Sequence, residues 1–312
     1  MKSSTRTVLV TGTSTGIGRA TAELLVSRGY RVLAGTRNPG DPGSIPTGAE
    51  PVHLDVTRDD DVTALVERLR AACPDGLYAL INNAGVAPPA PVELIDLDEL
   101  RQVMEVNLLG PLRLIQACLP MLRQQRRARI INMSSMNGTM AMPMVGAYSA
   151  SKFALEALSD TLRVELRPWG IAVSCIRPGQ VRTEIFTKAL AALGDRARRI
   201  PAELLPGYSK LFAKSKQFSK RGANHGIHAD VVARAVLKSL RARRPKPRYL
   251  VGFDANGLSL LRALTSTRLL DRLMSRMMGT MHLWPAEAEV DEPLTPRPEA
   301  PRQLRPGTLR NA

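Results

Sequence analysis

Aromatic side chains are scarce in this sequence, at 4% of its 312 residues. A core of domain size must therefore consist mainly of aliphatic side chains, and the hydrophobic fraction of 44% is sufficient for one large globular domain. Cysteine is also rare, since only Cys73, Cys118 and Cys175 are present. Three widely separated cysteines in apolar surroundings argue against a disulfide framework and a structural metal site, and they indicate buried thiols in a reducing compartment.

Long hydrophobic runs are absent as well. No uninterrupted apolar stretch has the length of a membrane span, and no signal-peptide pattern precedes Val8-Leu9-Val10. These absences predict a cytoplasmic protein.

Acidic residues are few: 28 Asp and Glu stand against 44 Lys and Arg, which gives a net charge of +16. Between residues 196 and 248, fifteen basic residues accompany only Glu203 and Asp230. Such a surface can attract anionic lipid or an acidic partner, or it can be an ordinary solvated face. No nucleic-acid-binding motif accompanies the charge, so we expect no nucleic acid partner.

The segment from Ile130 to Lys152 holds residues suited to proton transfer. Tyr148 and Lys152 stand four residues apart in a predicted helix, so their side chains share one face. An ammonium group beside a phenol lowers the pKa of the tyrosine, which can then exchange a proton near neutral pH. Ser135 ends an apolar, strand-like run and can hold a carbonyl oxygen near the phenol. Taken alone, a Tyr-x-x-x-Lys pair is far more typical of a core tyrosine and a solvated lysine than of a catalytic pair.

A glycine-rich turn follows the first predicted strand. Residues 11–18 read Thr-Gly-Thr-Ser-Thr-Gly-Ile-Gly, and a helix is predicted to begin near Gly16. Backbone amides at such a helix start suit a pyrophosphate. The spacing Gly-x-x-x-Gly-x-Gly differs from the standard dinucleotide fingerprint, so by itself it indicates only a sharp strand-to-helix turn.

Several short motifs agree in order and spacing along the chain. They are Thr11–Gly18, Asn82-Asn83-Ala84-Gly85, Asn107, Ser135, Tyr148, Lys152 and Pro178-Gly179. Together they resemble the classical short-chain dehydrogenase/reductase family over about residues 7–251, and its 17β-hydroxysteroid and retinol dehydrogenase branch in particular. The resemblance implies an α/β, doubly wound, Rossmann-like fold with a central parallel sheet flanked by helices.

The resemblance also implies a domain organisation. Residues 1–256 would form the dinucleotide-binding and catalytic domain, in which the irregular but apolar segment 184–226 corresponds to a substrate lid. An apolar lid implies a hydrophobic alcohol or ketone substrate. Residues 257–284 predict an amphipathic helical extension with arginines between its apolar residues. Such a helix packs on its own domain, docks on a twin subunit in a homo-oligomer, or makes peripheral contact with a membrane. The Pro-rich residues 285–312 predict a disordered tail.

Four residues match the catalytic positions of the family. The resemblance implies that Ser135 binds the substrate oxygen, that Tyr148 exchanges its proton, and that Lys152 lowers the tyrosine pKa and binds the nicotinamide ribose. Asn107 would belong to a proton relay behind the lysine. The expected cofactor-binding residues are Gly12, Thr13, Ser14, Thr15, Gly16, Ile17, Gly18, Arg37, Asp55, Val56, Asn83, Ala84, Gly85, Tyr148, Lys152, Pro178, Gly179, Val181 and Thr183.

The end of the second predicted strand selects the cofactor. In dinucleotide folds an acidic residue here binds the ribose 2′-hydroxyl of NAD, whereas an arginine suits the 2′-phosphate of NADP. The sequence reads Gly35-Thr36-Arg37, which favours NADP(H) over NAD on charge grounds. One departure from many NADP-using relatives is Thr15, which stands where those proteins carry a second basic residue.

Two other functions remain open. A non-catalytic NADPH-binding regulatory protein would be expected to lack the catalytic residues, and all four are present. A member of the family acting on a polar substrate, such as a sugar nucleotide epimerase, would share Tyr-x-x-x-Lys but should have a different glycine spacing and a polar nucleotide pocket.

Overall fold

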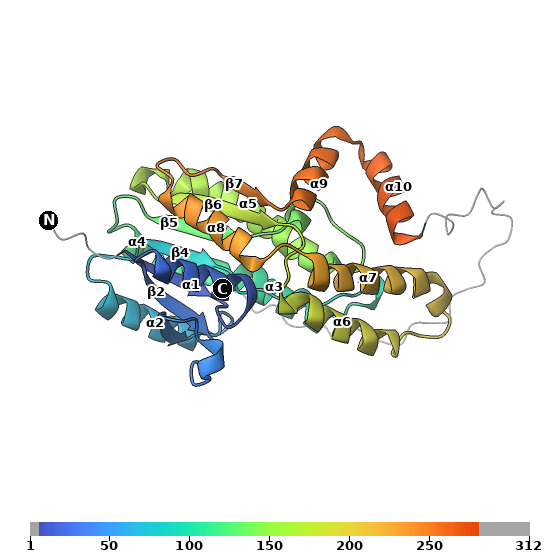
Figure 1. Ribbon diagram of the computed structural model, residues 1–312, viewed down its shortest axis with the longest axis horizontal. Coiled ribbons are helices and arrows are strands. Elements are labelled where there is room, and N and C mark those ends of the chain that lie inside the picture. Colours follow the sequence, from blue (N-terminus) through green and yellow to red (C-terminus); the bar gives the residue numbers. More distant parts are fainter. Residues whose placement is uncertain (1–5, 281–312) are drawn as a thin grey trace, which may run out of the picture.

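The computed structural model describes residues 6–280, and a seven-stranded parallel sheet runs through its centre (Figure 1). The strand order is β3-β2-β1-β4-β5-β6-β7. The strands are β1 (Thr7–Thr11), β2 (Arg31–Thr36), β3 (Glu50–His53), β4 (Ala79–Asn82), β5 (Arg129–Met133), β6 (Ala172–Pro178) and β7 (Arg248–Val251). All five residues of β1 are buried, as expected of a parallel strand covered on both faces. The predicted Rossmann-like fold is confirmed.

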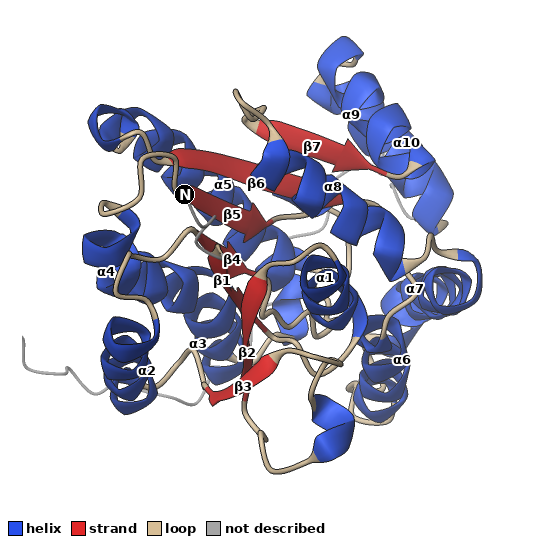
Figure 2. Ribbon diagram, turned by 60° about the vertical axis from the view of Figure 1, so that its left-hand side comes forward, coloured by secondary structure: helices blue, strands red, loops and turns tan. Residues whose placement is uncertain are grey.

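Helices cover both faces of the sheet (Figure 2). On one face α1 (Gly16–Ser27) and α8 (Ala229–Arg241) pack together, with Leu25 and Val236 in the core. The helices of the other face are α2 (Asp59–Ala72), α3 (Leu97–Met104), α4 (Gly110–Leu122) and α5 (Gly146–Glu165). The core between these helices and the sheet is almost wholly aliphatic, as the scarcity of aromatic residues requires, and Leu65 and Leu114 are fully buried in it.

Segment 184–226 is regular, contrary to the irregular pattern expected from the sequence. It forms helices α6 (Glu184–Ala197) and α7 (Leu205–His225), which pack against each other. The buried residues of α7 are spaced by three and four positions, as in any amphipathic helix, and they are Phe212, Ser215, Ser219 and Gly222. Only one of these four is a large apolar residue, which hides the helical period from an analysis of hydrophobicity.

The C-terminal extension also differs from the prediction, because it consists of two helices. They are α9 (Phe253–Leu264) and α10 (Thr267–Met278), and Ser266 caps the second by accepting a hydrogen bond from the backbone N–H of Leu269. Helix α10 buries Leu270, Met274 and Met278 against the catalytic domain. One side of the extension therefore packs on its own domain. The predicted tail, 285–312, lies outside the described residues.

Residues 6–280 include no helix that combines the length and the apolar character needed to cross a bilayer.

Candidate active site

The residues singled out in the sequence gather at the carboxyl edge of the sheet, where the strand order reverses between β1 and β4. In open α/β sheets, ligands bind in the crevice at such a reversal. Here the crevice is a cleft of about 1670 Å³, counting the open space at its mouth. Two smaller cavities continue it toward Tyr148, and each shares lining residues with the next.

The glycine turn is packed so closely that side chains are excluded from it. A Cβ atom on Gly12 would lie 2.8 Å from the Cα of Ala84, and one on Gly18 would lie 2.1 Å from the carbonyl oxygen of Gly12. Gly12 also has a φ of +66°, which favours glycine. Thr11 Oγ1 accepts hydrogen bonds from the backbone N–H groups of Asn83 and Ala84. The turn is thereby fixed against the loop that follows β4.

Two predicted cofactor contacts support this turn instead of facing the cleft. Thr13 is fully buried and donates its hydroxyl to the carbonyl of Gly35, and Gly18 lies behind the turn. The side chain of Asn83 borders the cleft, but its amide donates to the carbonyls of Thr11 and Gly12. The predicted residues that border the cleft are Gly12, Ser14, Thr15, Gly16, Ile17, Arg37, Asp55, Val56, Asn83, Ala84, Gly85 and Thr183.

Arg37 and Asp55 lie together at the outer end of the cleft. Arg37 is exposed, and no acidic residue occupies the end of β2 beside it. Burial opposes ionisation of Asp55, but two hydrogen bonds from Thr57 and the positive charge of Arg37 lower its pKa. The chain thus presents a carboxylate and a guanidinium close together in the cleft, where contacts to the adenosine half of the cofactor are predicted.

Ser135, Tyr148 and Lys152 border one cavity, next to Pro178 and Gly179. Val181 and Thr183 border it as well, so the predicted nicotinamide loop lines the same cavity. The Ser135 Oγ accepts a hydrogen bond of 3.1 Å from the backbone N–H of Asn137, which orients the hydroxyl.

The ionisation of Tyr148 differs from the expectation that Lys152 makes it acidic. Burial raises the pKa of Tyr148, although a hydrogen bond with Ser135 acts in the opposite direction. The Lys152 Nζ lies 5.6 Å from the centre of the phenol ring and donates to the carbonyl of Met133 at 2.8 Å. Desolvation is thus the main influence on the pKa of Tyr148 in this structure, and it acts against ionisation of the phenol.

Lys152 is itself unusual, because it is 4% exposed. Burial lowers its pKa from 10.5 to about 8, and the nearby Glu156 carboxylate opposes this shift. Glu156 lies one turn further along α5 and forms a buried ion pair with Arg177, with N–O distances of 2.6 and 2.8 Å. The sequence analysis missed this pair, although an acidic residue four positions after Lys152 on an apolar helix face was the available signal.

Asn107 lies in a π-helical turn, Glu105–Leu109, between α3 and α4. Such turns interrupt the regular hydrogen-bond ladder and recur at functional sites. Its side-chain amide donates to the carbonyl of Val86 at 2.8 Å and to Ser151 Oγ at 3.0 Å. The side chain of Asn107 thus ties this turn to the loop after β4 and to α5. A role in a proton relay stays a prediction.

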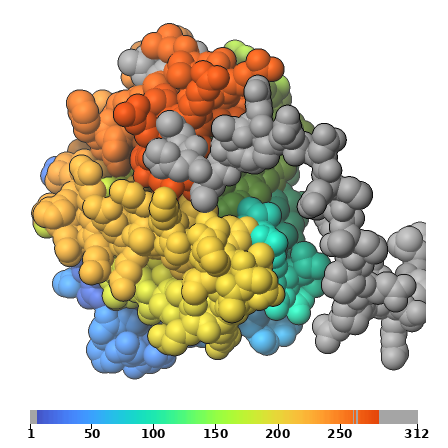
Figure 3. Space-filling model, turned by 90° about the vertical axis from the view of Figure 1, so that its right-hand side faces the viewer, coloured from blue at the N-terminus to red at the C-terminus, as the bar shows by residue number. Residues whose placement is uncertain are grey.

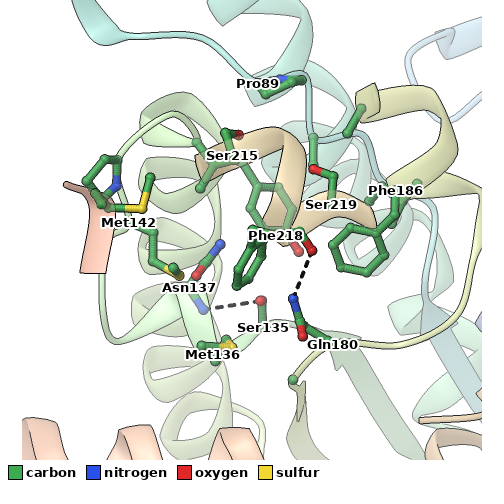
Figure 4. Close-up of a pocket in the computed structure, with 18 residues that line it drawn as sticks. Pro89, Ser135, Met136, Asn137, Met142, Gln180, Phe186, Ser215, Phe218 and Ser219 are labelled. Atoms are coloured by element: carbon green, nitrogen blue, oxygen red, sulfur yellow. Dashed lines mark hydrogen bonds between the residues drawn. The ribbon is translucent and has the colours of Figure 1, made fainter. Parts of the chain in front are cut away.

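A largely apolar cavity adjoins Ser135 and Tyr148 (Figure 4). It encloses about 820 Å³, counting its open mouth, and Met136, Phe186 and Met278 are among its walls. Met278 belongs to α10, so the C-terminal extension closes one side of the cavity. The cavity also contains a few polar side chains that the sequence analysis did not identify, which are Asn137, Gln180, Ser215 and Ser219.

This geometry agrees with the comparison to known families. A family model described as short chain dehydrogenase matches residues 6–193. The chain belongs to this family. One relative of this short-chain dehydrogenase is 3-amino-tetrahydro-pyrrolizinone reductase of Xenorhabdus hominickii, which is 33% identical over 81% of this chain and 89% of the relative. Human retinol dehydrogenase 16 is 33% identical over 86% of this chain and 87% of the relative. Human 17-beta-hydroxysteroid dehydrogenase type 6 is 30% identical over 90% of this chain and 90% of the relative.

Solved structures give the same assignment. A short-chain dehydrogenase from Streptomyces avermitilis superimposes with a TM-score of 0.71 at 29% identity, over 91% of this chain and 98% of that one. A second, from Burkholderia cenocepacia, is in complex with NADP; its TM-score is 0.67 at 26% identity, over 88% of this chain and 99% of that one. A third, from Burkholderia phymatum, is in complex with NAD; its TM-score is 0.69 at 26% identity, over 87% of this chain and 95% of that one. This short-chain dehydrogenase is therefore an oxidoreductase with a nucleotide-binding fold, and the choice between the two cofactors depends on its own residues.

Proposed function

We propose that the protein is an NADP(H)-dependent oxidoreductase that interconverts a hydroxyl and a carbonyl group on a hydrophobic substrate. The observation that carries the proposal is that Ser135, Tyr148 and Lys152 border a cavity that continues into the dinucleotide cleft on one side and into an apolar cavity on the other. Relatives named for retinol and for a 17β-hydroxysteroid support the substrate class.

Each catalytic side chain has a separate task in this proposal. Ser135 donates a hydrogen bond to the substrate oxygen, and Tyr148 donates a proton to it during reduction. Lys152 binds the nicotinamide ribose and favours the tyrosinate that remains after the transfer. When bound, NADP(H) supplies or accepts the hydride. The chain positions the reactants, and the apolar walls exclude water from the reacting carbonyl.

The test of the function is a screen of NADPH oxidation against steroid, retinoid and fatty ketones. Turnover of at least one apolar ketone supports the proposal. NADPH binding without turnover of any substrate would favour a non-catalytic regulatory protein. Turnover confined to polar sugar derivatives would favour a family member that acts on a polar substrate. Residence in the cytoplasm stays a prediction.

The cofactor preference makes a prediction about Arg37. Replacing it with aspartate removes a charge-assisted hydrogen bond to the 2′-phosphate and places a carboxylate where NAD has a ribose hydroxyl. We expect the ratio of kcat/KM for NADP over NAD to fall by about 100-fold, because such a bond contributes roughly 1.5–3 kcal/mol. Arg28→Asp is the control, because this exposed arginine does not border the cleft. An unchanged ratio in Arg37→Asp would refute the NADP assignment.

We also propose that the outer side of α10 contacts an anionic membrane surface. Figure 3 shows the orange-red C-terminal helices at the surface of the molecule, where α10 contacts α7. Its exposed side carries three large apolar residues and three arginines, which are Leu269, Leu273, Met277, Arg268, Arg272 and Arg276. The apolar residues recur every four positions and form one stripe beside the buried stripe. Apolar residues flanked by arginines suit the boundary between headgroups and acyl chains.

Replacing Leu269, Leu273 and Met277 together with serine is expected to abolish co-sedimentation with phosphatidylserine-containing vesicles. The substitutions leave the buried stripe intact, whereas deleting the extension would uncover it. Val164→Ser on α5 is the control, because this valine is also exposed. Vesicle binding that survives the triple substitution would refute the proposal. Self-association without vesicles, lost in the same variant, would identify a homo-oligomer interface instead.

A further inference from the structure

Two serines of α7 stand in the wall of the apolar cavity. Ser215 is 7% exposed and Ser219 is 5% exposed, and both share the buried face of the helix with Phe212 and Gly222. An apolar cavity wall is ordinarily built from apolar side chains, because burying a hydroxyl without a hydrogen bond costs roughly 1–3 kcal/mol. Ser215 and Ser219 line an open cavity, so a molecule that fills it and displaces water from the two hydroxyls must supply hydrogen bonds to them or bear this cost.

Hydrogen bonding within the protein does not provide it. Among residues 6–280, neither the Ser215 nor the Ser219 hydroxyl has a hydrogen-bond partner. Some helical serines bond to the preceding turn, as Ser151 and Ser159 do, at 2.7 and 2.6 Å, whereas the buried hydroxyls of Ser149 and Ser239 have no partner within the described residues. Ser215 and Ser219 differ from the latter two because they line the cavity. Ser215 and Ser219 thus retain their hydrogen-bonding capacity for something in the cavity.

The two serines face the same cavity as the catalytic groups. Ser135 borders it from the loop after β5 and Tyr148 from α5, whereas Ser215 and Ser219 belong to α7 and lie apart from Ser135 (Figure 4). A molecule filling this space can therefore meet hydroxyl groups at two separate places, with apolar walls between them.

Two contacts fix the position of helix α7 relative to the catalytic side of the cavity. Gln180, in the loop after β6, donates from Nε2 to the carbonyl of Phe218 at 3.3 Å. Gly222 lies against the ring of Phe186, where an added Cβ would come within 2.7 Å of ring atoms. These contacts fix the position of Ser219 relative to Gly179, which borders both the catalytic and the apolar cavities.

We propose that Ser215 and Ser219 form a second polar binding point, so that the substrate carries a second oxygen on its apolar skeleton. The substrate class is thereby narrowed to hydrophobic hydroxyketones, diketones or diols. One oxygen reacts at Ser135 and Tyr148, and the other, a hydroxyl or carbonyl, hydrogen-bonds to the serines of α7. This inference rests on the proposed function for the identity of the reacting end. A site that hydrogen-bonds an oxygen discriminates against the analogue that lacks it, because its own polar groups are then left unpaired.

The experiment compares pairs of ketones on several apolar skeletons, each with and without a distal hydroxyl group. The full-length wild type is expected to favour the hydroxylated member in kcat/KM by about 10- to 100-fold. In the variant Ser215→Ala/Ser219→Ala, the KM for the hydroxylated ketone should rise by about 10-fold or more, while that for the simple ketone should fall. These opposite changes distinguish recognition from a general loss of structure. Ser209→Ala, on the same helix but bonded to the carbonyl of Pro206, should change neither value.

Equilibrium dialysis of the same ketones gives the affinities without turnover, so that the two proposals can fail separately. Absence of turnover, together with an affinity preference that the double substitution removes, would contradict the proposed function and support the second binding point. Equal wild-type affinities within every pair, or a preference that survives the double substitution, would overturn the inference.

Discussion

Replacing Tyr148 with phenylalanine is expected to lower kcat by about 10²- to 10⁴-fold, the range by which a positioned acid–base group accelerates proton transfer. The substitution removes one oxygen from a cavity wall and leaves the ring, so the packing of α5 should persist. Affinity for NADPH should change little, because the glycine turn and Arg37 are untouched. The measurements are NADPH oxidation with the best ketone and titration of NADPH binding.

The matched control is Tyr208→Phe. This change also removes a phenolic oxygen, which bonds to Glu93, but Tyr208 does not border the catalytic cavity. Activity within a few-fold of wild type in Tyr148→Phe would refute the assigned role. Loss of activity in both variants would indicate that the assay reports folding and not proton transfer.

Replacing Lys152 with methionine is expected to lower kcat/KM by about 100-fold or more and to change stability in a pH-dependent way. Below about pH 8 both the folded and the unfolded chain hold the proton on Lys152, so the folded chain bears the full cost of burying an ammonium. Between about pH 8 and 10.5 the folded chain has released this proton and the unfolded chain has not. The stability of the wild type therefore rises with pH through this window as far as Lys152 is concerned.

Methionine is similar in length and carries no charge, so it removes this dependence. The difference in the free energy of unfolding, Lys152→Met minus wild type, should be largest near pH 7 and should shrink toward pH 10. The pH-dependent part of this difference should reach up to about 3 kcal/mol. Urea unfolding of both proteins at the two pH values measures it, and the other titrating groups cancel in the comparison. A difference that is independent of pH would show that Lys152 is not desolvated.

The positions of the chemistry were predictable because they depend on strand ends. Residues that directly follow parallel strands must meet at one edge of the sheet, so Gly12, Asn83, Ser135 and Gly179 are brought together by topology alone. The π-helical turn at Asn107 also has a local signal in the sequence, since Gly110-Pro111 directly after it is unfavourable inside a regular helix.

Features that depend on burial were not predictable in this way. The helical regularity of α7 is hidden because two of its buried positions are serines, and the amphipathic pattern of the extension does not reveal that α9 ends and α10 begins at the Ser266 cap. The ionisation of Tyr148 was predicted in the wrong direction, because the effect of a neighbouring ammonium is clear from spacing, whereas the extent of desolvation is set by the whole surrounding packing.

The sequence by itself determined the fold and the family, and it predicted the residues that the structure gathers at the carboxyl edge of the sheet, since these follow from local periodicity and from motifs in a fixed order. Only the tertiary structure decided which polar groups remain without partners inside the protein, and which side of the C-terminal extension faces the domain. Both are properties of the space between elements far apart in the chain: α7 and α10 close over Ser135 and Tyr148 from more than fifty residues away. Hydrogen-bond satisfaction and desolvation depend on that enclosure.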